Sequence, residues 1–175
     1  MKKNVIIAVL VIAVCGLGYV AYTNKTSTNT QSPNTNSGSG SNAAGSSHSS
    51  GKEINLANKN LTKLDKDILD DESVTRLDVS NNNLTGALPA EIRKLVNLQI
   101  LDASNNNMTG IPAEIGQLSQ LRVVDFANNN LSGLPLEIGS LKNLETLDLR
   151  SNPKISKLDL GKIQSSIPNA KILTD

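Results

Sequence analysis

The chain has 175 residues, of which 17 are Lys or Arg and 16 are Asp or Glu, so its formal net charge at pH 7 is +1. Three of the basic residues lie before residue 26, which leaves 14 basic against 16 acidic residues in the remainder. Nucleic-acid binding requires clustered Lys and Arg to neutralise phosphates, so this balance excludes DNA and RNA as partners. Once the two compositionally distinct N-terminal segments are set aside, about 120 residues remain, enough for one small folded domain.

An uncharged and strongly apolar stretch covers residues 5–22. At a helical rise of about 1.5 Å per residue it spans roughly 27 Å, just enough to cross a bilayer. Lys2 and Lys3 precede it, which favours a cytoplasmic N-terminus, and Tyr19 and Tyr22 lie where an aromatic belt is expected. We therefore predict an N-terminal signal anchor, a single transmembrane helix within residues 1–22, with the rest of the chain extracytoplasmic at the cell surface.

Two alternatives for this N-terminus stay open. A cleaved signal peptide also has a basic start and an apolar segment, and Gly16 and Gly18 are small enough to precede a cut, although apolar residues continue to Tyr22. The other alternative is lipid attachment at Cys15, which resembles the bacterial lipoprotein signal only in part because Val14 replaces a small residue. Cys15 is the only cysteine, so the folded part has no internal disulfide.

Residues 23–52 are mostly Ser, Thr, Asn and Gly, with very few apolar side chains. Burial of so little apolar surface cannot offset the entropy of ordering, so a disordered linker is predicted here. As a flexible coil it would have an end-to-end distance of about 30 Å, which would hold a domain clear of a membrane. The only histidine, His48, lies in this linker without a fixed second ligand.

The sequence from residue 51 onward repeats itself every 23 or 24 residues. Five copies begin near residues 51, 74, 98, 121 and 144, and the second reads Val-Thr-Arg-Leu-Asp-Val-Ser-Asn-Asn-Asn-Leu from residue 74. Within each copy, apolar residues alternate at period two, as Leu77 and Val79 do, which fits a short strand with one buried face. Pro89, Pro112 and Pro135 precede an apolar helical pattern, and we place them at the first position of a short helix or helical turn.

These copies match the L-x-x-L-x-L-x-x-N-x-L signature and so resemble the leucine-rich repeat family. Their second halves, such as Leu-Pro-Ala-Glu-Ile at residues 88–92, look like those of plant-type and intracellular adaptor-type repeats. The resemblance implies an α/β solenoid over residues 53–175, with parallel strands on a concave face and short helices or turns on a convex face. It also implies that the recurrent asparagines point inward as a structural ladder between coils, namely Asn82, Asn106, Asn129 and Asn152.

Both ends of the solenoid need covers for their apolar faces. At the start, Ile68 and Leu69 among acidic residues predict a solvated helix over the first coil. At the other end residues 158–173 no longer keep the period, and we interpret them as a closing cap that uses Leu158, Leu160, Ile163, Ile167, Ile172 and Leu173.

The family typically binds its partners on the concave face, so strand residues that do not enter the core are the candidate ligand contacts. The resemblance places there Arg76, Asp78, Ile100, Asp102, Arg122, Val123, Asp125, Thr146, Asp148 and Arg150. The four aspartates recur at one repeat position, so neighbouring strands set them about 4.8 Å apart in an acidic row that suits a basic peptide or a cation, with the arginines as counter-charges. The alternative is that the Asp belongs to the Leu-Asp-Leu consensus and has no ligand.

Catalysis requires a nucleophile, a base or metal ligands, and the folded part contains neither His nor Cys. We therefore expect no enzyme activity, no cofactor and no metal. The sequence predicts a membrane-tethered extracytoplasmic recognition or adhesion module that binds a protein or peptide. A glycan partner is disfavoured because the concave face has few aromatic side chains. Two alternatives remain open, a structural scaffold of the cell envelope and a secreted repeat protein released by signal cleavage.

Overall fold

The computed structural model describes residues 51–175, and all structural statements below concern this part of the chain. The predicted anchor and residues 23–50 of the predicted linker lie outside it. Within residues 51–175, no helix combines the length and apolar character that a membrane crossing requires.

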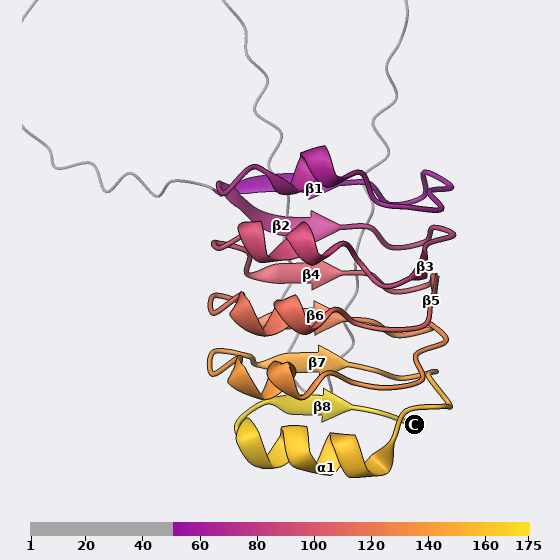
Figure 1. The fold of residues 1–175 in the computed structure, drawn as a ribbon, viewed down its shortest axis with the longest axis vertical. Helices are drawn as coiled ribbons and strands as arrows, with labels where there is room; N and C mark the ends of the chain where they lie inside the picture. Colours follow the sequence, from indigo (N-terminus) through magenta and orange to yellow (C-terminus); the bar gives the residue numbers. More distant parts are fainter. Residues whose placement is uncertain (1–50) are drawn as a thin grey trace, which may run out of the picture. The chain divides into compact units, whose positions relative to one another are not determined.

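Six short strands form one parallel sheet in the order β1-β2-β4-β6-β7-β8 (Figure 1). Their bounds are Lys52–Asn55 for β1, Val74–Asp78 for β2, Ile100–Asp102 for β4, Val123–Asp125 for β6, Thr146–Asp148 for β7 and Lys171–Leu173 for β8. Each strand therefore pairs with the strands of the adjacent coils, and the chain winds as a solenoid, as the sequence predicts.

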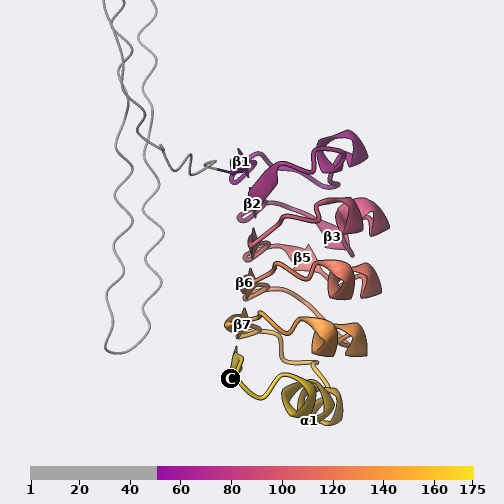
Figure 2. The same cartoon turned by 90° about the vertical axis from the view of Figure 1, so that its left-hand side faces the viewer.

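Short helices form the opposite wall of the solenoid (Figure 2). Four are 3₁₀ helices, η1 (Lys66–Leu69), η2 (Ala90–Lys94), η3 (Ala113–Gln117) and η4 (Leu136–Ser140), and the last is the α-helix α1 (Lys157–Ser166). A second, two-stranded parallel sheet lies on the flank between the two walls and consists of β3 (Thr85–Gly86) and β5 (Asn107–Met108).

The repeated prolines lie just before the 3₁₀ helices, whereas the sequence predicted them as the first helical residues. Pro89, Pro112 and Pro135 are the N-cap residues and keep extended ψ angles of 145°, 142° and 133°. Their carbonyl groups accept the first i to i+3 hydrogen bond, for example from the Ile92 N–H at 3.0 Å. The prediction of proline at the first helical position was wrong because a tight 3₁₀ turn takes its first acceptor from the preceding extended residue.

Aliphatic ladders fill the space between the two walls. Leu77, Leu101, Val124 and Leu147 are in register across the sheet and are almost fully buried. A second ladder consists of Val79, Ala103, Phe126 and Leu149, all with at most 1% of their surface exposed. The large Phe126 side chain occupies the same repeat position as the small Ala103 of the preceding coil, so a large residue in one coil compensates for a small residue in the next.

The C-terminal cap is a sixth coil rather than an irregular closure. Helix α1 replaces the 3₁₀ helix, and β8 adds a strand in which Ile172 pairs with Leu147. Ile163 and Ile167 are buried as predicted, but Leu158 is 69% exposed. Leu160, Ile163 and Ile167 are spaced along one face of the helix, whereas Leu158 is two residues from Leu160 and so faces away from the core.

The first coil is closed from the other side by η1. Its Leu69 is fully buried and Ile68 is half-buried, in agreement with the predicted cover. Asp65 caps η1, because its side chain accepts a hydrogen bond from the Asp67 N–H at 3.1 Å. Both ends of the apolar stack are therefore covered.

Candidate functional site

The outer face of the six-stranded sheet, called here the sheet face, carries the predicted ligand contacts in straight rows. One row contains Arg76, Ile100, Val123 and Thr146, which pair strand by strand. The ends of this row are Glu53 on β1 and Lys171 on β8. The register therefore places Ile100 directly beside Val123, and both side chains are half-buried.

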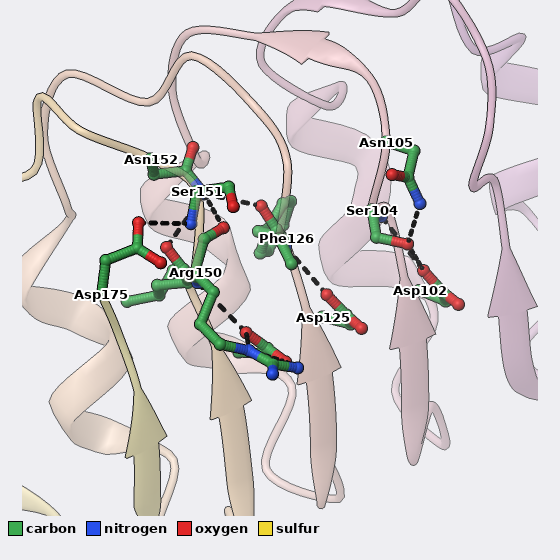
Figure 3. Close-up of polar contacts among 12 residues, drawn as sticks. Asp102, Ser104, Asn105, Asp125, Phe126, Arg150, Ser151, Asn152 and Asp175 are labelled. Atoms are coloured by element: carbon green, nitrogen blue, oxygen red, sulfur yellow. Dashed lines mark hydrogen bonds and ion pairs between the residues drawn. The ribbon is translucent and has the colours of Figure 1, made fainter. Parts of the chain in front are cut away.

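The four aspartates form a second row, in register from β2 to β7. Their carboxylates turn toward the backbone that follows each strand. The Asp78 Oδ1 accepts hydrogen bonds from the Ser80 N–H at 3.0 Å and the Ser80 hydroxyl at 2.7 Å. Asp102 makes the same two contacts with Ser104, also at 3.0 and 2.7 Å (Figure 3).

Burial differs along this row. Asp78 and Asp148 are buried, with 4% and 6% of their surface exposed, whereas Asp102 and Asp125 are half-buried. Asp78 and Asp148 therefore offer little of their surface to a ligand, and each side chain folds back to hold the turn two residues later. This contact favours the structural alternative for the row.

Asp125 is the least compensated carboxylate of the row. The residue two positions on is Ala127 instead of Ser, so Asp125 accepts the Ala127 N–H at 2.8 Å but no hydroxyl group. Burial, followed by the negative charges of Asp102 and Asp148, raises the pKa of Asp125 to about 6, although the Ala127 N–H opposes this shift. Burial also raises the pKa of Asp102, whose contacts with Ser104 oppose the increase.

Two of the three arginines predicted as counter-charges, Arg122 and Arg150, form ion pairs within the chain. The Arg150 Nη2 lies 2.5 Å from the Asp148 Oδ2 and so compensates the charge of the last member of the acidic row. The Arg122 Nη2 lies 2.6 Å from the Glu145 Oε1 on the adjacent coil. The exposed Arg122–Glu145 pair contributes little to stability, but a ligand carboxylate would have to compete with both pairs.

The four recurrent asparagines are buried inside the turns that follow the strands. Asn106 is typical, because its amide group donates to the carbonyl groups of Val79, Ala103 and Ser104 at 3.1 to 3.2 Å. Its Oδ1 accepts the Leu84 N–H of the previous coil at 3.0 Å. Asn82, Asn129 and Asn152 make corresponding contacts, so these side chains bridge adjacent coils and are occupied by the backbone.

The leucine-rich repeat region family matches residues 76–164, which is half of the chain. The chain belongs to the leucine-rich repeat family. No curated protein matches it.

Solved leucine-rich repeat structures share its fold. A leucine-rich repeat protein of Leptospira interrogans is 33% identical with a TM-score of 0.58, over 69% of this chain and 36% of that protein. The plant peptide hormone receptor RGFR1 in complex with RGF2 is 33% identical with a TM-score of 0.57, over 70% of this chain and 20% of the receptor. The ectodomain of the receptor kinase SOBIR1 from Arabidopsis thaliana is 28% identical with a TM-score of 0.56, over 69% of this chain and 67% of that ectodomain. The chain therefore spans about a third or less of the length of the first two proteins.

This leucine-rich repeat chain has a further surface that the sequence analysis missed. A groove of about 350 Å³ lies on the flank beside β3, away from the strand rows. The sequence holds one signal for it, because the ladder asparagines Asn82 and Asn106 are 24 residues apart whereas the next two intervals are 23. Within residues 51–175, no cluster of three His, Cys, Asp or Glu side chains is placed to hold a metal ion.

Proposed function

We propose that this protein is a membrane-tethered, extracytoplasmic recognition module whose sheet face binds a protein or peptide partner. The observation that carries the proposal is the regular display on this face. The half-buried Ile100 and Val123 form an aliphatic centre, with Arg76 and Thr146 on either side and the acidic row beside it. An apolar centre with a polar surround is the usual organisation of a protein-binding surface.

Peptide complexes of similar structures support the choice of partner. RGFR1 is described in complex with RGF2, and the leucine-rich repeat ectodomain of the receptor kinase HAESA in complex with an IDA peptide hormone ligand. HAESA is 30% identical over 64% of this chain. This chain covers 19% to 20% of the length of these two receptors.

The proposed tether rests on the sequence of residues 1–50. An apolar stretch at residues 5–22 follows two lysines, and a Ser-, Thr-, Asn- and Gly-rich segment separates it from β1. A binding module on a flexible tether gains effective concentration for partners in the same envelope, which suits a face without large aromatic anchors.

A photocrosslinking experiment tests the binding face. Benzoylphenylalanine is introduced at Val123 in the full chain on intact cells and, as a matched control, at Leu136, which is 51% exposed in η4 on the opposite wall. The expected result is a discrete crosslinked partner from position 123 only. Val123→Glu should then weaken capture of this partner by roughly fivefold or more, because it puts a charge at an apolar contact. Equal crosslinking from both positions would contradict the proposal.

External protease on intact cells tests the topology separately. A C-terminal tag should be lost while an uncut N-terminal fragment stays in the membrane fraction. A soluble product that lacks the N-terminal segment would instead identify the secreted alternative, and a protected tag would overturn the extracytoplasmic location. If the tag is lost but no partner is crosslinked at position 123, the envelope-scaffold alternative replaces recognition.

A further inference from the structure

The flank groove lies between the first and second coils, at β3. Its lining includes the buried side chains of Leu64, Leu84, Leu88 and Met108, and its rim includes Lys63 and Lys66. A volume of about 350 Å³ is within the usual range for ligand pockets. The groove thus combines an apolar floor with a positively charged rim, on a surface distinct from the sheet face.

The second repeat is one residue longer than the later ones, and this additional residue lies at the groove. The later repeats pass from Gly110 to Ile111 and from Gly133 to Leu134, whereas the second repeat has Ala87 between Gly86 and Leu88. Gly86 has a φ of +73°, and an added Cβ there would meet nothing within 4 Å, so this position borders open space. Residues 85–87 are all exposed.

Strand β3 has an unpaired edge that faces this groove. On its other side the Gly86 carbonyl accepts the Thr109 N–H at 2.8 Å, as part of the pairing with β5. Because successive residues of a strand direct their backbone groups to opposite sides, those of Thr85 point toward the first coil, and β3 ends at Gly86 before Ala87. The first and second coils are joined at Asn83, whose N–H donates to the Leu61 carbonyl at 2.8 Å. Beyond it, in the described part of the chain, Thr85 and Ala87 make no backbone hydrogen bond with the first coil.

The charges at the rim select the chemistry of a partner. The Lys66 Nζ lies 2.8 Å from the Glu91 Oε1, so its charge is partly compensated. Lys63 is exposed, and among residues 51–175 no carboxylate lies within ion-pair distance of it. An acidic side chain beside the groove would complement Lys63, whereas a basic one would be repelled.

We propose that the flank groove binds an extended peptide segment of a partner protein, which adds a strand to the unpaired edge of β3. An aliphatic side chain of the segment fills the groove over Leu64 and Leu88, and an acidic residue two positions away lies beside Lys63. Strand addition supplies affinity through backbone hydrogen bonds, and alternate side chains supply specificity. This site goes beyond the proposed function, because it is on the flank and does not depend on the sheet face.

The test uses a fluorescein-labelled peptide of sequence TEVLVET and the full-length chain, with binding followed by fluorescence anisotropy. In an extended peptide the central Leu and both Glu side chains lie on one face. Saturable binding is expected. A peptide with N-methylated backbone at the three central residues should bind roughly tenfold more weakly or worse, because it cannot pair with the edge. Absence of saturable binding by TEVLVET, or equal binding by the N-methylated peptide, would overturn the proposal.

Two variants connect the binding to the groove. Deletion of Ala87 restores the 23-residue spacing and should weaken TEVLVET binding by roughly tenfold, the effect of losing one buried aliphatic contact. Lys63→Glu should weaken it by about threefold at low salt and reverse the preference toward TKVLVKT. Lys154→Glu, an exposed site at the opposite end of the solenoid, is the matched control and should leave binding unchanged.

Variants of the sheet face distinguish this proposal from the proposed function. Val123→Glu should leave TEVLVET binding intact, whatever its effect on the partner crosslinked at position 123. Loss of TEVLVET binding in Val123→Glu, or an equal loss in Lys63→Glu and Lys154→Glu, would overturn the flank site. Circular dichroism and the thermal midpoint of the Ala87 deletion check that it is folded, and Lys63→Glu supplies the test independently if it is not.

Discussion

The turns after the strands require one residue with a left-handed backbone, and asparagine supplies it in four coils. Asn58, Asn81, Asn105 and Asn128 have φ values of 54° to 58°. Asparagine tolerates this region better than most residues with a side chain. The last turn has Ser151 at the same place, with a φ of 57°. The backbone N–H of Ser151 donates to the Asp175 Oδ2 at 2.7 Å, so the C-terminal residue reinforces this strained turn (Figure 3).

Replacing Ser151 with asparagine should therefore stabilise the protein. Ser151→Asn is expected to raise the free energy of unfolding by about 0.5–1 kcal/mol, because it reduces the cost of the left-handed conformation while leaving the N–H bond to Asp175 in place. Urea denaturation followed by circular dichroism measures the change. Ser119→Asn is the control at an exposed turn position without a positive φ and should change little. Equal shifts in the two variants would show that backbone strain at residue 151 is not the cause.

The ladder asparagines stabilise the turns in a different way, because their side chains form hydrogen bonds with backbone N–H and carbonyl groups. The Asn129 Oδ1 accepts the Met108 N–H at 2.9 Å, and its amide group donates to Ala103, Phe126 and Ala127. Asn129→Ala should lower the free energy of unfolding by about 2–4 kcal/mol, because a buried N–H and buried carbonyl groups lose their partners. Thermal and urea unfolding measure the loss. Asn130→Ala, at the exposed neighbouring residue, is the control. A comparable loss of unfolding free energy in this variant would contradict the account.

At the element scale, glycines let the short helices stack closely. A Cβ at Gly116 in η3 would lie 2.4 Å from the Glu137 carbonyl oxygen of η4, and one at Gly139 would lie 2.8 Å from the Ser166 Cβ of α1. The equivalent residue of η2 is Arg93, so the constraint applies from the third coil onward. The close spacing of η3 and η4 is therefore limited by the Glu137 backbone, and that of η4 and α1 by the Ser166 side chain.

Gly116→Ala and Gly161→Ala should change stability in opposite directions. The first forces η3 away from η4 and is expected to cost about 1–3 kcal/mol, as overpacking does. The second lies in α1 with open space around its Cβ and should stabilise by about 0.5–1 kcal/mol, because alanine is the better helix former. Urea midpoints of the two variants give both signs in one assay. A stabilising Gly116→Ala would mean that the helices have room to separate.

The repeats made most elements predictable, and the exceptions have physical reasons. Leu147 and Leu149 could be assigned to a strand because their spacing matches three earlier copies, but Ile172 could not, because helix α1 lengthens the last coil and shifts the spacing. Leu158 was assigned to the cap from its apolar character alone, whereas its helical phase exposes it.

For the whole molecule, the sequence defined the rows of the sheet face but not the state of the side chains in them. The register of Asp78, Asp102, Asp125 and Asp148 follows from the repeat period. Their burial does not, because Asp78 and Asp102 make the same contacts with their own turns and still differ in exposure. The flank groove was missed for a similar reason, since one extra residue in a repeat does not reveal whether the chain bulges outward or is absorbed in the turn.

The acidic row extends across four strands of the solenoid, so its charge should make the stability of the whole molecule depend on pH. The pKa of Asp125 is raised from 3.8 to about 6, mainly by burial and then by Asp102 and Asp148. The folded state therefore binds this proton more tightly than the unfolded chain does. The resulting stabilisation is fully present below about pH 4 and is lost as the pH rises through about 6. Asp71 affects the stability in the opposite direction, because hydrogen bonds from Lys52 and Ser73 lower its pKa to about 2. Its contribution to the stability of the folded state is therefore lost as the pH falls through about 2.

The free energy of unfolding is thus expected to rise by on the order of 1–2 kcal/mol between pH 7 and pH 5. In Asp125→Asn the increase in unfolding free energy between pH 7 and pH 5 should be smaller, because only the raised pKa of Asp102 still contributes to it. At pH 7 the variant should be more stable than the unmodified protein. The amide still accepts the Ala127 N–H, so the turn is preserved. Urea unfolding at several pH values measures both effects, with Asp67→Asn as the exposed control that keeps the full rise. An identical pH profile in Asp125→Asn would mean that the row is solvated well enough for its charges to be screened, and the burial of Asp125 would then have no energetic consequence.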